Sequence, residues 1–357
     1  MTDRALDEAK SEAFAGYMVD ILNNAAVALM TSIGHQVGLF DAMADQPPAT
    51  SHHIAEAANL NERYVREWLG NMVTGRVVIY DPADATYLLP PEHAAWLTRS
   101  SGINNLAVQT QYIPLLGQFE ELIINCFRNG GGVPYSAYPQ FQRLMAEDSA
   151  TVHDAALVDA ILPLVSGLVE RLQAGIDVAD IGCGRGHAVN LMAQAFPQSR
   201  FVGYDFSEEG VFAGQSEAQG MGLTNVQFEA RNVTKLEIYD QFDLITAFDA
   251  IHDQAQPDQV LQGIANALRL DGVFLMVDIG ASSHVHENID FMLGPLVYAI
   301  SCMHCMTVSL ALDGAGLGAM WGEQKAREML VDAGFTQVEV KQLDGDLFNN
   351  YFIAKKG

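Results

Sequence analysis

One stretch near the middle of the chain constrains the fold more than any other. Residues 178–181 (VADI) form an apolar run of strand length, and the next residues, GCGRG, place Gly182, Gly184 and Gly186 at alternate positions. Glycine has no Cβ, so such a segment can turn sharply and let a ligand approach its backbone. From His187 to Phe196 apolar residues recur at helical spacing. The pattern predicts a strand, a tight turn and a helix.

A second strand is expected after this helix. Arg200–Tyr204 leads into Asp205, whose carboxylate is suited to accept two hydrogen bonds from ribose hydroxyls. The spacing G-x-G-x-G differs from the G-x-G-x-x-G of dinucleotide sites, and no Walker lysine follows, so the stretch does not call for a phosphate. The strand, helix and second strand together predict a βαβ motif that binds a nucleoside.

This stretch resembles motif I of the class I S-adenosylmethionine (SAM) methyltransferases, and Asp205 resembles their acidic ribose-binding residue. The resemblance implies SAM as the cofactor, with the glycines against its amino-acid portion. Where the family often places an Asp-bearing turn against the adenine, this chain has Asn232, whose amide can still form a hydrogen bond. The cofactor-binding residues implied in this way are Asp180, Gly182, Cys183, Gly184, Gly186, Asp205, Phe206, Asn232, Val233, Phe248 and Asp249.

Strands and helices keep alternating after Asp205. The expected helices are 208–219, 257–268 and 323–333, and the expected strands are 226–230, 242–248, 273–279, 337–343 and 350–354. The last two strands are joined by one short connection, so they must be antiparallel. The predicted fold class is therefore α/β, a Rossmann-like class I methyltransferase sheet with an antiparallel C-terminal hairpin, preceded by a mostly helical winged-helix domain.

The N-terminal region is expected to be helical. Leu6–Leu39 has helical apolar spacing with little charge after Asp20, so this helix must be buried within its own domain or against a second copy of the chain. Ser51–Leu97 has the rhythm of a winged helix-turn-helix, with Ser51 as a helix cap, helices at 53–58 and 62–73, and a wing formed by 77–80 and 87–89.

A winged helix can bind DNA, and Arg63, Arg66 and Arg76 would be the residues to do so. Against this, Glu62 and Glu67 lie on the same helix, and the chain has a formal net charge of −25, which disfavours a polyanionic partner. We therefore expect a dimerisation and substrate-positioning domain, a homodimer, and no nucleic-acid partner.

Composition also bears on the compartment. Four cysteines are too few and too scattered for a disulfide framework, and the charged N-terminus lacks the apolar core of a signal peptide. Apolar runs such as 25–30 are too short to span a bilayer. These features predict a cytoplasmic protein without a membrane partner.

A histidine after the strand 242–248 is the candidate catalytic residue. Ile251-His252-Asp253 resembles the "HDW" segment of the winged-helix O-methyltransferases of the plant phenol and hydroxyindole type. The resemblance implies that His252 is the general base for a hydroxyl acceptor, with Glu323 as counterpart of a second base; Gln254 replaces the tryptophan, and 318–323 is out of register. A neutral imidazole suits this role. The alternative is that His252 closes the strand end by bonding a backbone carbonyl.

Two further features leave alternatives open. His284, His286, Cys302, His304 and Cys305 are zinc-ligand types, but their spacings match no standard structural site, and 292–306 also fits an apolar helix that lines a core or pocket, so no metal is expected. The glycine-rich segment 129–135 is either a mobile lid or a connector, and 313–318 is expected to be a flexible loop over the substrate. Pro163 should interrupt a helix at 151–172.

Together these features predict a winged-helix dimerisation and substrate-lid domain at 1–148 and a SAM-binding methyltransferase domain at 149–357. The predicted activity is methyl transfer to a small, partly apolar acceptor through a hydroxyl. Transfer to nitrogen, sulfur or carbon on the same fold, and a SAM-binding winged-helix regulator without catalysis, are the alternatives. The sequence does not identify the acceptor.

Overall fold

The chain divides into two compact units. The computed structural model describes residues 6–344, 346 and 348–356, and the units are Met1–Leu115 and Leu116–Gly357. The segment that precedes the predicted boundary at residue 148 makes contacts within the second unit: Val133 N–H donates to Thr307 Oγ1 (2.8 Å), and the Tyr138 hydroxyl donates to the Met303 carbonyl (2.6 Å). The division into compact units therefore falls earlier in the chain than the predicted functional boundary.

The first unit contains the expected winged helix-turn-helix. Its elements are α1 (Glu8–Gln36), α2 (Leu39–Ala44), α3 (Ser51–Ala57), α4 (Glu62–Thr74), β1 (Ile79–Asp81), β2 (Thr86–Leu88), α5 (Pro91–Ala94), η1 (Arg99–Asn104) and α6 (Leu106–Gln109). Strands β1 and β2 pair antiparallel and form the wing. The predicted cap is wrong by one residue: Thr50 Oγ1 accepts from His53 N–H, whereas Ser51 Oγ donates to Glu62 Oε1 (2.7 Å).

Helix α1 buries little of its apolar surface within this unit. Near its C-terminal end Thr31, Ser32 and His35 are buried, and Trp68 Nε1–H donates to the Met30 carbonyl (2.7 Å). Earlier turns expose large side chains, of which Leu22 is 67% exposed. By length and hydropathy alone α1 also satisfies the criteria of a membrane-spanning helix, which soluble core helices and signal sequences satisfy too; the bent pair 143–164 and 168–174 passes the same test jointly.

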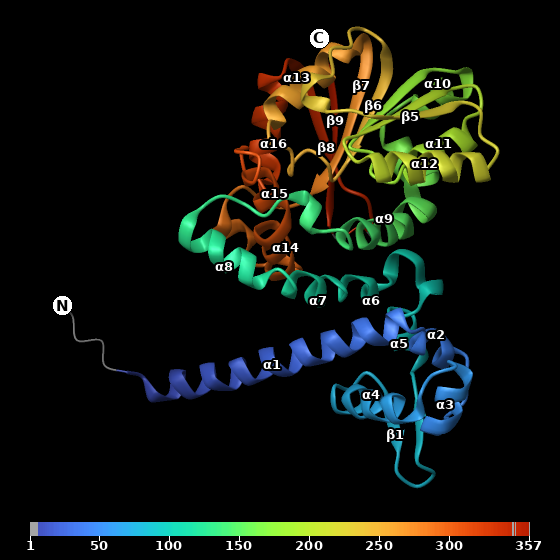
Figure 1. Ribbon diagram of the computed structural model, residues 1–357, viewed down its shortest axis with the longest axis vertical. Helices are drawn as coiled ribbons and strands as arrows, with labels where there is room; N and C mark the ends of the chain where they lie inside the picture. The colour runs from blue at the N-terminus through green and yellow to red at the C-terminus, as the bar shows by residue number, and fades with distance from the viewer. Residues whose placement is uncertain (1–5, 345, 347, 357) are drawn as a thin grey trace. The chain divides into compact units, whose positions relative to one another are not determined.

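The second unit is built on a seven-stranded sheet of order β5-β4-β3-β6-β7-β9-β8 (Figure 1). The strands are β3 (Asp177–Ile181), β4 (Arg200–Asp205), β5 (Val226–Ala230), β6 (Phe242–Phe248), β7 (Leu268–Ile279), β8 (Phe335–Lys341) and β9 (Asn349–Lys356). Strand β9 runs antiparallel to both β7 and β8, and the other pairs are parallel. The predicted Rossmann-like sheet with an antiparallel C-terminal hairpin is confirmed.

Helices cover both faces of this sheet (Figure 1). Successive strand residues alternate between two cores: Val178 and Leu244 pack with α10, α11 and α12, whereas Ala179 and Ile245 pack with α13 and α16. The helices, with α7 spanning the boundary between units, are α7 (Tyr112–Gly117), α8 (Glu120–Asn129), η2 (Tyr135–Ala137), α9 (Phe141–Ala156), η3 (Leu157–Ile161), η4 (Leu162–Leu164), α10 (Leu168–Ala174), α11 (His187–Ala195), α12 (Glu208–Gly220), η5 (Val233–Lys235), α13 (Pro257–Ala267), η6 (Val285–Asn288), α14 (Gly294–Ile300), η7 (Ser301–Cys305), α15 (Met306–Leu310) and α16 (Gly322–Asp332). The expected helix break occurs at η3 and η4, around Pro163.

The glycine-rich loop before α16 is anchored, whereas a flexible loop was expected. Ala315 N–H donates to the Ala255 carbonyl (2.9 Å), and Gly318 N–H donates to the carbonyl of His252 (3.1 Å). Gly322, the first residue of α16, has φ +79°, and a Cβ there would lie 2.1 Å from the backbone nitrogen of Ser283. The loop therefore packs closely against the strand ends that carry the candidate site.

Candidate active site

The glycine turn after β3 forms an open cradle. Gly182 and Cys183 both donate their N–H groups to the Tyr204 carbonyl at the end of β4 (2.8 and 3.0 Å). Gly182 has φ +72°, and a Cβ there would lie 2.5 Å from Cβ of Ala250, so a larger residue is excluded. Gly184 has φ +54° with nothing within 4 Å of its Cβ position. The turn is thus fixed on one side and accessible to a ligand on the other.

Asp205 is fixed beside this turn by two backbone donors. Its Oδ2 accepts from Gly184 N–H and its Oδ1 accepts from Ser207 N–H, both at 2.8 Å. Burial raises the pKa of Asp205, and the backbone hydrogen bonds oppose this shift only in part. A carboxylate oxygen can accept more than one hydrogen bond, so both oxygens can also receive ribose hydroxyls.

Asp180 and Cys183 lie at the root of the same turn. The buried Asp180 carboxylate accepts from Thr246 Oγ1 (2.6 Å), and burial raises the pKa of Asp180 to about 7. Burial also raises the pKa of the Cys183 thiol well above its usual value, so the thiol is neutral. Near neutral pH Asp180 can therefore change its charge, whereas Cys183 cannot.

The candidate adenine contact lies at the end of β5. Asn232 Oδ1 accepts from Thr234 N–H (3.0 Å) and from the Thr234 hydroxyl (2.7 Å), and so caps η5. This arrangement leaves the Asn232 amide nitrogen as a donor, which suits a ring nitrogen of adenine. Val233, next in the chain, is buried in the core.

Two aromatic rings lie at the ends of β4 and β6. Phe206 is 57% exposed, and its ring meets that of Tyr135 edge-on at 4.9 Å between centroids. The ring of Phe248 meets that of His153, with 4.8 Å between the ring centroids. The sequence-predicted cofactor residues therefore lie at the carboxyl ends of the neighbouring strands β3, β4, β5 and β6, the edge where open α/β sheets bind ligands.

His252 is bonded to a carboxylate that the sequence analysis did not single out. The Nδ1 atom of His252 lies 2.8 Å from Oδ1 of Asp278, and both side chains are buried. Burial lowers the pKa of His252, but the Asp278 carboxylate and the Cys305 thiol outweigh it, so this pKa lies well above its ordinary value.

Asp278 was detectable in principle. It follows Val277 in β7, which pairs with Phe248 of β6, and His252 comes four residues after Phe248. A carboxylate at the end of the strand beside the histidine-bearing one is the signal that could have found it. Glu323, the predicted second base, bonds Arg327 Nε (2.7 Å) and Asn350 Nδ2 (3.4 Å), so Asp278 is the carboxylate bonded to His252.

A small acidic group surrounds the imidazole. Ligand-type atoms of Asp249, His252 and Asp278 lie within 4.8 Å of one another. Oδ1 of Asp249 and Oδ2 of Asp278 are buried and have no hydrogen-bond partner among the described residues. Burial and the charge of Asp278 raise the pKa of Asp249 to about 8. These two oxygens are available to receive a cationic group.

The histidines and cysteines considered for zinc are arranged differently. Within the described part of the chain, they do not form a group whose ligand atoms lie as close together as those of the His252 group. His304 instead stacks on Phe141, with ring centroids 3.4 Å apart, and is buried. Tyr135 and Tyr138 meet the same ring edge-on. His304, Phe141, Tyr135 and Tyr138 therefore form an aromatic wall.

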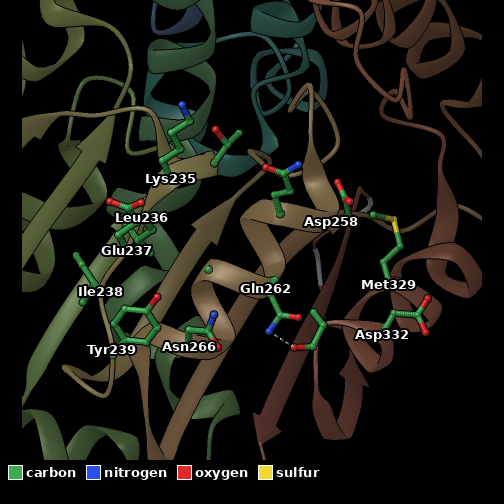
Figure 2. Close-up of a pocket in the computed structure, with 14 residues that line it drawn as sticks. Lys235, Leu236, Glu237, Ile238, Tyr239, Asp258, Gln262, Asn266, Met329 and Asp332 are labelled. Atoms are coloured by element: carbon green, nitrogen blue, oxygen red, sulfur yellow. Dashed lines mark hydrogen bonds between the residues drawn. The ribbon is translucent and has the colours of Figure 1, made fainter.

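A separate cavity of about 520 Å³ runs along α13 (Figure 2). It is lined by residues 234–239, by α13 residues from Asp258 to Asn266, and by Met329, Asp332 and Ala333 near the end of α16. No residue of the glycine turn or of the His252 group lines it. We place the active site at the strand ends because the titratable groups converge there.

Comparisons with known proteins agree with this architecture. Residues 25–99 match the family described as the Rv2258c-like winged HTH domain, and residues 172–334 match a methyltransferase domain family. Among solved structures, the mitomycin 7-O-methyltransferase MmcR has a TM-score of 0.72 at 17% identity, covering 98% of this chain and 100% of that one. Human N-acetylserotonin methyltransferase, solved in complex with SAM, has a TM-score of 0.67 at 15% identity, with 100% of both chains covered. At these identities the likeness shows the fold.

Curated relatives match a smaller part. The malonyl-[acyl-carrier protein] O-methyltransferase of Bacillus cereus is 26% identical over 165 residues, 46% of this chain and 55% of that protein. The chain thus spans about half the length of this relative. The chain therefore contains a methyltransferase domain with the class I fold, preceded by a winged helix-turn-helix domain of the Rv2258c-like type.

The placement of the cofactor can be tested at Asp205. Asp205→Ala removes a charged acceptor worth about 1.5–3 kcal/mol, so we expect affinity for S-adenosylhomocysteine to fall about 10- to 100-fold in calorimetry. Asp258→Ala, in the cavity of Figure 2, is the control and should bind as wild type does. The assignment would be wrong if Asp258→Ala lost affinity and Asp205→Ala did not.

Proposed function

We propose that this chain transfers the methyl group of SAM to a hydroxyl of a small, partly apolar acceptor, with His252 as the general base. The observation that carries the proposal is the hydrogen bond between His252 and Asp278 at the carboxyl edge of the sheet, beside the glycine turn. The O-methyltransferases that share the fold are consistent with a hydroxyl acceptor.

The chain's own residues fit the cofactor. The accessible backbone at Gly184 admits its amino-acid portion, the fixed carboxylate of Asp205 accepts the ribose hydroxyls, and the Asn232 amide faces the adenine. The partnerless oxygen of Asp249 is suited to a cationic group, which would favour the ionised form of that carboxyl. When bound, SAM supplies a methyl group activated by a sulfonium charge.

His252 prepares the acceptor for this transfer. Asp278 accepts a hydrogen bond from Nδ1–H of His252, so the imidazole is held with Nε2 as its basic atom. When Nε2 removes the hydroxyl proton, the imidazolium that forms is stabilised by the Asp278 carboxylate. Most of the remaining rate comes from holding the acceptor oxygen and the methyl group at near-attack distance.

The acceptor is proposed to be partly apolar because of the side chains around His304. Tyr135, Tyr138 and Phe141 pack against this buried imidazole. Tyr135 also contacts Phe206, the residue after the proposed ribose-binding Asp205. Such a wall favours a flat or apolar molecule over a polyanion.

Removal of the base provides the direct test. His252→Ala should slow single-turnover methylation of a hydroxyl acceptor by about 10²–10⁴-fold and leave affinity for S-adenosylhomocysteine unchanged. In the wild type the rate should fall as the pH drops through the His252 pKa, because a protonated imidazole cannot accept a proton. Since this pKa is raised, the fall should occur above the ordinary histidine value of about 6.5.

The control is His286→Ala, which changes an exposed histidine outside the site and should behave as wild type. A His252→Ala enzyme as fast as wild type with the same pH profile would leave proximity as the sole source of catalysis. If the protein bound the cofactor but methylated no acceptor under any condition, this result would favour the alternative, a SAM-binding winged-helix regulator without catalysis.

The winged-helix domain is proposed to dimerise rather than to bind nucleic acid. On α4, Arg63 pairs with Glu67 (2.5 Å) and Arg66 with Glu62 (3.4 Å), so two of the arginines that would contact DNA carry acidic partners. The apolar side chains that α1 exposes would be covered by a second copy of the chain. We accordingly propose that the protein is a homodimer in the cytoplasm and has no membrane partner.

Assembly is tested by charging this helix. Leu22→Asp places a carboxylate on the exposed apolar face of α1 and should convert a dimer into a monomer in light scattering at micromolar concentration. Leu270→Asp is the matched control, because Leu270 is 66% exposed in the second unit, nearly as exposed as Leu22 at 67%. A wild-type monomer would contradict the dimer, and flotation of the wild type with anionic vesicles would instead assign α1 to a membrane surface.

A further inference from the structure

We propose that Trp321 is a positioning residue for catalysis: its indole N–H holds the Asp278 carboxylate in the orientation that makes Nε2 of His252 the basic atom. This inference rests on the proposed function, because it assigns how the base is oriented. Trp321 precedes α16 and lies two residues before Glu323, the residue that the sequence pointed to in this segment.

The geometry centres on one oxygen atom. Oδ1 of Asp278 accepts three hydrogen bonds: from His252 Nδ1 (2.8 Å), from the backbone N–H of Ile279 (2.8 Å) and from Trp321 Nε1 (3.0 Å). Asp278 is 0% exposed, His252 4% and Trp321 5%, so water does not compete for these bonds. An indole N–H and a backbone N–H can only donate. The carboxylate oxygen is therefore the acceptor for all three, and Nδ1 must carry a proton.

The second oxygen of Asp278 explains why the orientation needs to be held. Oδ2 is buried and has no partner among the described residues, and the same is true of Asp249 Oδ1 nearby. Because no described residue holds Oδ2, the carboxylate can rotate away from the imidazole unless the bonds to Oδ1 prevent it. The N–H donors on Oδ1 oppose that rotation, and Trp321 is the one supplied by a side chain distant in sequence from both Asp278 and His252.

The position of the indole is fixed by its own backbone. Trp321 N–H donates to the Gly318 carbonyl (3.1 Å), Gly318 N–H donates to the His252 carbonyl (3.1 Å), and the Trp321 carbonyl accepts from Ser283 Oγ (2.6 Å). The segment that carries the donor is thus tied to the residue whose base it orients. The glycine-rich loop 313–318 accordingly serves to bring Trp321 beside Asp278.

The direction of the effect follows from electrostatics. A hydrogen bond donated to a carboxylate stabilises its negative charge and weakens its hold on the imidazole proton. Loss of the indole N–H should therefore strengthen the attraction between Asp278 and the imidazolium. The fall of the methylation rate on the acid side of the pH profile, its acid limb, should then move to higher pH. It should also free the carboxylate to rotate, so that some His252 carries its proton on Nε2 and cannot act as a base.

The test replaces only the donor. Trp321→Phe should lower single-turnover methylation about 10- to 100-fold, the range for losing a bond that orients a functional histidine, and move the acid limb upward. Trp68→Phe is the matched control, because the buried Trp68 also donates from Nε1 to an oxygen, the Met30 carbonyl, but lies in the first unit. If Trp321→Phe does not fold, site-specific β-(3-benzothienyl)alanine at position 321 keeps the ring shape and has sulfur in place of N–H.

A second readout is independent of catalysis. Nitrogen-15 NMR of labelled histidine reports the tautomer, and among the 10 histidines the His252 signals are those lost in His252→Ala. We expect a single Nδ1–H form in the neutral wild type and a mixture after loss of the indole donor. Unchanged tautomer and pH profile in the substituted protein would overturn the positioning role, even if its rate fell. If His252→Ala were fully active, the general base would be wrong, while the tautomer measurement would still decide the role of Trp321.

Discussion

The bond between His252 and Asp278 depends on the parallel pairing of β6 and β7. In this register Phe248 lies opposite Val277, and the N–H of Asp249 donates to the Val277 carbonyl (2.9 Å), so the chain leaves β6 directly beside the end of β7. The histidine four residues later then meets the carboxylate that follows Val277. Parallel strands bring their carboxyl ends to one edge, and here that edge combines His252, its carboxylate partner Asp278 and the glycine turn.

This edge is also where buried charge is concentrated. Burial raises the pKa of Asp180 to about 7, and burial together with Asp278 raises the pKa of Asp249 to about 8. Ionising a buried carboxyl group is costly unless a cationic group lies beside it. If the positively charged cofactor binds at this edge, as we propose, it would supply that compensation.

Much of the fold was predictable because it depends on local patterns. Alternating strands and helices, the glycine turn, Asp205 and the break at Pro163 each leave a signature within a few residues. The strand order of the sheet was not predicted, because consecutive strands such as β5 and β6 are not neighbours in it. Asp278 and Trp321 were not singled out because their roles arise from contacts between segments distant in sequence. Glu323 was chosen by its place in a motif, whereas its charge is engaged by Arg327 on the same helix. The anchored loop was taken as flexible because its glycines permit close packing as readily as mobility.

A crystal structure of the protein with S-adenosylhomocysteine tests most directly whether the cofactor's sulfur faces His252 at the carboxyl edge of β3 and β6. We expect ribose hydroxyls on Asp205, adenine beside Asn232, and a sulfur directed toward Nε2 of His252 with space for one methyl group and an acceptor oxygen. A ligand bound along α13, in the cavity of Figure 2, or a sulfur directed away from His252, would contradict the account.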